Sequence, residues 1–104
     1  MKQIVLSPER PWKDAKKTAE AEIKSAGGVV LVAKTPRARR NLEKINREYQ
    51  FPRRHHPESP PETWPRRSDE IAPRTFWNEA GDRYLLLSFP DHKVELRAGV
   101  PVTD

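Results

Sequence analysis

Two stretches of the chain carry apolar residues at helical spacing. In the first, apolar residues recur every three or four positions: Trp12, Ala15, Ala19, Ile23 and Ala26. The second repeats this spacing with Ala38, Leu42, Ile45 and Tyr49. Such spacing places the apolar side chains on one face of a helix. We therefore expect two amphipathic helices, the first beginning near Pro11 and ending at Gly27, which suits a helix C-cap.

A continuous apolar run, Val29–Ala33, separates the two helices. A short run of this kind, rich in β-branched valine, is typical of a strand that is covered on both faces. After it, Thr35 offers a hydroxyl as helix N-cap, and Pro36 fits the first helical position, where no amide donor is needed. The stretch from Gly27 to Tyr49 is thus predicted to be a strand, a tight turn and a helix.

Further strands are expected at both ends of the chain. Residues 3–6 read as a short strand, so the first half forms a βαβα unit, in which we expect parallel strand pairing. The last third reads as an antiparallel meander with strands near 75–77, 83–89 and 94–98, and a hairpin is expected within 83–98. The predicted fold class is α/β (α+β), with two helices packed on one mixed sheet.

The length of 104 residues suits one small domain, 1–104. The chain has no cysteine, which excludes disulfides and zinc–thiolate sites, and we expect no cofactor. No aliphatic run is long enough to span a bilayer, and the N-terminal region lacks a secretory apolar segment. We therefore expect a cytoplasmic or virion-associated protein that is neither secreted nor membrane-bound.

Positive charge is concentrated in the middle of the chain. The net charge is +5, and residues 34–75 alone hold eleven bases and six acids. Three arginines crowd the predicted start of the second helix, where the helix dipole disfavours cations and the free amides attract anions. We therefore predict an anion-binding or nucleic-acid-binding site built from the following residues: Lys34, Thr35, Arg37, Arg39, Arg40, Arg53, Arg54, Arg66 and Arg67.

A proline- and arginine-rich segment at 52–75 follows the second helix and is predicted to be extended. It is read as a cationic arm or a solvated connection. Trp64 within it and Trp77 just after it are predicted to stack on bases or to anchor a partner. His55 and His56 are adjacent and would point to opposite sides of an extended chain, so no metal site is predicted.

The sequence Leu6-Ser7-Pro8-Glu9 resembles the strand-to-helix opening of ParE/RelE-type toxins, which are small basic proteins that end in a β-meander. The chain departs from that family by placing Val29–Ala33 between its helices, where those toxins have a helical hairpin. The resemblance implies an RNA-cleaving enzyme that uses arginines and a histidine, although no catalytic constellation is visible and a non-enzyme is favoured.

Three functions therefore stay open. The first is binding of nucleic acid, DNA or RNA, through the cationic helix start and the arm. The second is a protein-binding inhibitor or assembly factor that acts on an acidic protein surface. The third is the RNase-like toxin.

Overall fold

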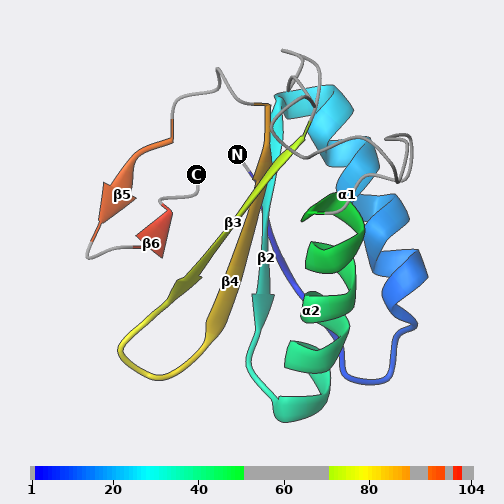
Figure 1. The fold of residues 1–104 in the computed structure, drawn as a ribbon, viewed down its shortest axis with the longest axis vertical. Helices are drawn as coiled ribbons and strands as arrows, with labels where there is room; N and C mark the ends of the chain where they lie inside the picture. The colour runs from blue at the N-terminus through cyan, green and yellow to red at the C-terminus, as the bar shows by residue number, and fades with distance from the viewer. Residues whose placement is uncertain (1, 51–70, 90–93, 98–99, 102–104) are drawn as a thin grey trace, which may run out of the picture.

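The computed structural model describes residues 2–50, 71–89, 94–97 and 100–101. Its elements in chain order are β1 (Lys2–Val5), α1 (Trp12–Ala26), β2 (Gly28–Ala33), α2 (Pro36–Gln50), β3 (Ala72–Trp77), β4 (Arg83–Ser88), β5 (Leu96–Arg97) and β6 (Val100–Pro101). Both helices lie on the same side of the sheet, and the short β5–β6 hairpin lies on the other side (Figure 1).

The four long strands form one mixed sheet in the order β1-β2-β4-β3. β1 pairs with β2 in parallel, whereas β4 is antiparallel to both of its neighbours. The α+β class, with two helices packed on one mixed sheet, is confirmed. The prediction succeeded because each helix carries its apolar residues at helical spacing and β2 is apolar throughout.

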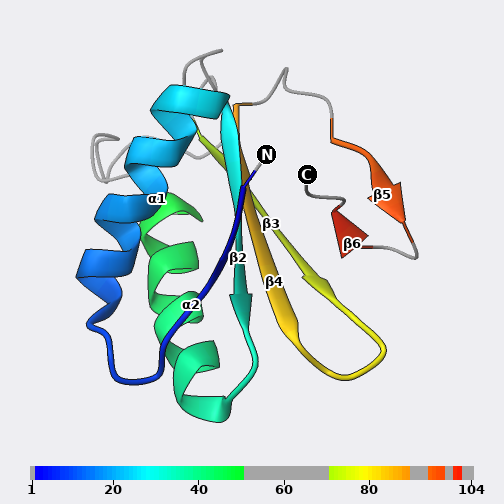
Figure 2. The same ribbon diagram turned by 180° about the vertical axis from the view of Figure 1, so that it is seen from behind.

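The main core lies between the helices and the sheet. α1 contributes small side chains and Ile23, α2 contributes larger aliphatic ones, and the sheet contributes alternate residues of β2 and β4. Ala15 and Ala19 are buried on the face of α1 that packs in this core, and Figure 2 shows from behind that α1 lies on the same side of the sheet as α2. Neither helix in the described part of the chain is long and apolar enough to cross a membrane.

A second, smaller cluster covers the opposite side of the sheet. Val30, Val32 and Leu86 are fully buried there, and Phe76, Tyr84 and Val94 pack against them. Both faces of β2 are therefore covered, as its uninterrupted apolar sequence predicted. The helices cover only one of these faces, and the segment leading into β5 helps to cover the other.

The prediction of a hairpin within residues 83–98 is wrong. Leu96 and Arg97 pair with Val100 and Pro101 in a separate two-stranded sheet, and β4 is already paired on both sides. A third meander strand had no free edge of β4 to join. The strand that was predicted at 75–77 begins earlier, at Ala72, so the last residues of the proline-rich segment belong to β3. Pro73 is tolerated within this strand because β3 lies at the edge of the sheet.

Hydrogen bonds confirm the predicted C-terminal cap of α1 and the predicted N-terminal cap of α2. Gly27 ends α1 in a left-handed conformation with φ of 83°, and its amide donates to the Ile23 carbonyl over 2.8 Å. The Thr35 hydroxyl accepts a hydrogen bond from the Ala38 amide at 3.1 Å and caps α2. These two caps fix β2 between the helices and set where the first turn of α2 begins.

Candidate nucleic-acid interface

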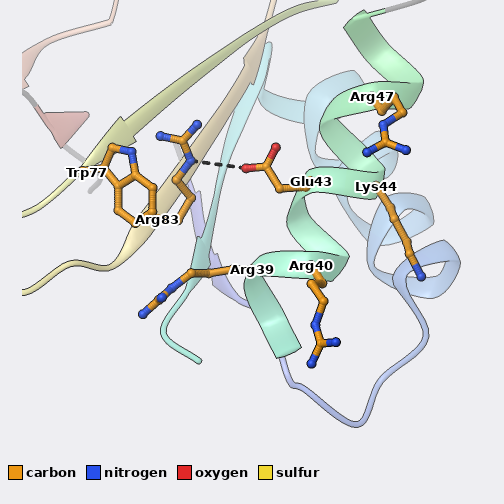
Figure 3. Close-up of a pocket in the computed structure, with 7 residues that line it drawn as sticks. All are labelled: Arg39, Arg40, Glu43, Lys44, Arg47, Trp77 and Arg83. Atoms are coloured by element: carbon orange, nitrogen blue, oxygen red, sulfur yellow. Dashed lines mark hydrogen bonds and ion pairs between the residues drawn. The ribbon is translucent and has the colours of Figure 1, made fainter. Parts of the chain in front are cut away.

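A groove of about 360 Å³ runs between α2 and the ends of β3 and β4. Its lining carries five cations, one acid and one indole: Arg39, Arg40, Glu43, Lys44, Arg47, Trp77 and Arg83. We call this surface the Trp77 groove (Figure 3). The first turn of α2 and the β3–β4 turn lie at the same end of the molecule (Figure 1).

Strand register places Trp77 directly opposite Arg83. Directly opposed residues of an antiparallel pair point to the same face, here the face that carries the helices. The turn between them is held by Asn78, whose side-chain oxygen accepts the Asp82 amide at 2.8 Å and whose side-chain nitrogen donates to the Asp82 carboxylate at 3.1 Å. Gly81 supplies the positive φ of 86° that this turn needs. The turn therefore fixes the two groove residues relative to each other.

The indole of Trp77 is 54% exposed and has two arginine neighbours. The guanidinium carbon of Arg83 lies 4.6 Å from the ring centroid, and that of Arg39 lies 6.0 Å from it. Both distances are within the range of cation–π attraction, which is stronger at the shorter one. Trp77 is thus held at the groove without being covered.

The two arginines differ in their remaining contacts. Arg83 has a side chain only 16% exposed, and its Nε donates to a carboxylate oxygen of Glu43 at 3.4 Å. The Nε of Arg39 is buried and finds no acceptor among the described residues. A buried donor without an acceptor is unfavourable, so a rearrangement of the side chain that brings this Nε to an anion would gain a hydrogen bond. The charge of Arg83 is thus largely balanced in place, whereas Arg39 has no acidic partner among the described residues.

The remaining cations form a row along the outer side of α2. Arg40, Lys44 and Arg47 are all exposed and occupy positions i, i+4 and i+7, which spans about 10 Å of helix. In Figure 3, Arg40 and Lys44 project away from the indole, while Arg39 reaches towards it. The groove therefore has an aromatic end and a cationic side.

Of the residues proposed from sequence, the structure brings Arg39, Arg40 and Trp77 together in this groove. Lys34 and Arg37 are exposed near the start of α2 and do not line the groove. Thr35 acts as a cap, so the Ala38 amide is already occupied and is not free for an anion. The other proposed residues lie outside the described part of the chain: Arg53, Arg54, Arg66, Arg67 and Trp64.

Sequence reasoning missed three cations of the groove, Lys44, Arg47 and Arg83. The first two could have been found, because with Arg40 they repeat at helical spacing on the polar side of an amphipathic helix. Arg83 could not be found in this way. Its place depends on the β3–β4 register and on the packing of α2 beside the sheet.

Among the described residues, no group of histidine, cysteine and acidic side chains could hold a metal ion. All three histidines fall outside that part of the chain, so the enzyme alternative stays a prediction. Comparison with protein-family models, with curated proteins and with solved structures finds no match.

Proposed function

We propose that the protein binds nucleic acid through the Trp77 groove. The observation that carries this proposal is a groove that is lined by five cations and one acid and has an exposed indole at one end. Arginine and lysine bind phosphates, and aromatic rings stack on bases, so this combination suits nucleic acid better than it suits a simple anion.

Energetics also support a binding role for these cations. Three arginines lie within the first five residues of α2, the first turn holds no acidic residue, and two of these arginines, Arg39 and Arg40, line the groove. The helix dipole makes such an arrangement unfavourable by typically 0.3–1 kcal/mol per charge at an exposed site. Phosphates from a ligand would remove this repulsion.

The test compares two charge-matched double variants in binding to fluorescein-labelled single-stranded and duplex oligonucleotides over a salt series. Arg40→Gln with Arg47→Gln removes two groove cations. Lys17→Gln with Lys24→Gln removes two exposed cations of α1 that do not line the groove. The groove double variant should weaken binding and reduce the slope of log K against log salt by about 0.7–0.9 for each lost phosphate contact. The α1 double variant should retain most of the affinity.

Equal losses in the two double variants would show diffuse charge attraction and would contradict the groove as the binding site. Absence of wild-type binding to either oligonucleotide at low salt would contradict the proposal as a whole.

The second candidate is binding of an acidic protein segment, and one observation favours it. β3 is the end strand of the four-stranded sheet in the described part of the chain, and it borders the groove. An extended peptide could add to such an edge and place acidic side chains near Arg39 and Arg40. Pull-down with wild type and with the groove double variant tests this candidate if nucleic acid does not bind.

A further inference from the structure

The exposed ring of Trp77 suits a ligand that is itself flat and aromatic. Tryptophan is highly buried on average, yet this ring is about half exposed at a turn that fixes its position. Its neighbours in the groove are cations and one acid. A flat, apolar and electron-rich surface of this kind, framed by positive charge, matches the face of a nucleobase that has phosphates on either side.

The two arginines at the ring have different parts in this arrangement. Arg83 is the nearer one, is mostly buried, and is tied to Glu43, so it backs the ring and holds its orientation. Arg39 lies at the outer limit of cation–π contact and has a buried Nε without an acceptor among the described residues. Arg39 can leave the ring at little cost and has a donor to offer.

We propose that Trp77 and Arg39 form a site for one unpaired nucleotide, and that the protein therefore prefers single-stranded nucleic acid to duplex. The base stacks on the exposed part of Trp77, and Arg39 donates to the adjoining phosphate. The inference rests on the proposed function, because Arg40 and Arg47 supply the neighbouring phosphate contacts.

The preference for single strands follows from the chemistry of stacking. Bases in a duplex are already stacked on one another, so their faces are not accessible to an indole at the side of a groove. An unpaired base presents its whole face, and every base has one, so the site is tolerant of sequence. Arg83 acts here as a positioning residue, since it touches the ring and Glu43 rather than the nucleotide.

The experiment measures the affinity of wild type, Trp77→Ala and Trp77→Phe for a fluorescein-labelled oligothymidylate and for a blunt-ended duplex of two annealed strands at one salt concentration. Trp77→Ala should weaken single-strand binding by roughly tenfold or more and change duplex binding by less than about twofold. Trp77→Phe should restore part of the single-strand affinity, because a phenyl ring still stacks. Trp12→Phe, at the partly buried first residue of α1 that packs against the core, is the matched control and should leave both affinities unchanged.

A second readout follows the ring directly. In a Trp12→Phe and Trp64→Phe background, Trp77 is the one remaining tryptophan, and oligothymidylate should quench its fluorescence with the same midpoint as the anisotropy change. Arg39→Gln in this background should weaken single-strand binding and lower its salt slope by about 0.7. Circular dichroism of each variant checks that the fold is kept.

The outcomes separate this inference from the proposed function. Two results would contradict the proposed nucleotide site: wild type binds duplex as tightly as single strand, or Trp77→Ala lowers both affinities by the same factor. In either case the wider proposal of nucleic-acid binding survives. Trp77 fluorescence that is not quenched at a saturating concentration of oligothymidylate would likewise contradict the nucleotide site. If wild type binds neither ligand, both proposals fail.

Discussion

The hydroxyl of Tyr49 donates a hydrogen bond to a carboxylate oxygen of Glu20 over 3.2 Å. This contact joins the last turn of α2 to the middle of α1. Lys16 reinforces it, because its Nζ lies 3.7 Å from the same carboxylate oxygen and 5.4 Å from the centroid of the Tyr49 ring. A polar contact at the edge of the core thus helps to hold the two helices side by side.

Stability should fall at alkaline pH in a manner that depends on Tyr49. Burial, together with the negative charge and hydrogen bond of Glu20, raises the pKa of Tyr49 above its usual value of 10.0. Above that value the unfolded chain releases the proton and the folded chain keeps it, so this contribution to stability is complete below about pH 10 and declines at higher pH.

Urea denaturation followed by circular dichroism checks this, with Tyr49→Phe as the comparison. Near neutral pH the variant should lose about 1 kcal/mol through the missing hydrogen bond. Above about pH 10 the difference in the free energy of unfolding between the two proteins should shrink, because Tyr49 then ionises in the unfolded wild-type chain but not in the folded one, which stabilises the unfolded state. A constant difference across this range would mean that Tyr49 ionises equally well in both states.

Charge placed in the smaller core should unfold the domain. Val30 and Leu86 are direct partners across β2 and β4, and both are fully buried. Val30→Asp or Leu86→Asp would leave a carboxylate without a partner at a cost of several kcal/mol, against a typical total stability of about 5–15 kcal/mol. Thermal melting should show loss of the cooperative transition. Val5→Asp, on the same face of the sheet but 54% exposed, is the control and should cost about 1 kcal/mol or less.

Replacing Glu43 should strengthen nucleic-acid binding while leaving the fold nearly unchanged. Glu43 is 46% exposed, so its ion pair with Arg83 contributes at most about 1 kcal/mol. Glu43→Gln raises the net charge of the groove by one and removes the carboxylate that would repel a phosphate. We expect a several-fold gain in affinity by anisotropy and a steeper salt dependence. A loss of affinity would indicate that the orientation of Trp77 depends on this ion pair more than on the turn.

Gly81→Ala should destabilise the β3–β4 turn through backbone strain alone. A methyl group at this position would meet no atom within 4 Å, but φ of 86° is unfavourable for alanine. We expect a loss of about 1–2 kcal/mol in urea denaturation. The exposed turn residue Glu79 is the control, and Glu79→Ala should stay within about 0.5 kcal/mol of wild type. If Gly81→Ala is equally harmless, the turn has another accessible conformation.

The sequence predicted the fold well where local spacing decides the structure. The stripes on α1 and α2 and the apolar run of β2 each define an element and its buried side. The error at residues 94–98 had a different origin. Alternation around Leu96 indicates a strand but does not indicate its partner, and β4 had already paired with β2 on the side that the meander needed.

Local spacing likewise decided which residues of the candidate site could be predicted from the sequence. Arg39 and Arg40 were predicted because their cluster is local, and Trp77 because it is an aromatic residue close to a basic segment. Their association with Arg83 and Glu43 was not predictable, since it arises from pairing between strands and from a contact between residues forty positions apart. Spacing within one helix is readable in a sequence, whereas the approach of a helix to a strand end is not.

The assembly of the Trp77 groove from α2, β3 and β4 links ligand binding to folding. The unfolded chain keeps the cations but separates Arg39 from Trp77, so only the folded chain offers the complete site. A ligand that binds only the folded form at one hundred times its Kd would raise the free energy of unfolding by about 2.7 kcal/mol. A small domain with a modest core would thus become markedly harder to unfold, and to degrade, while its ligand is present.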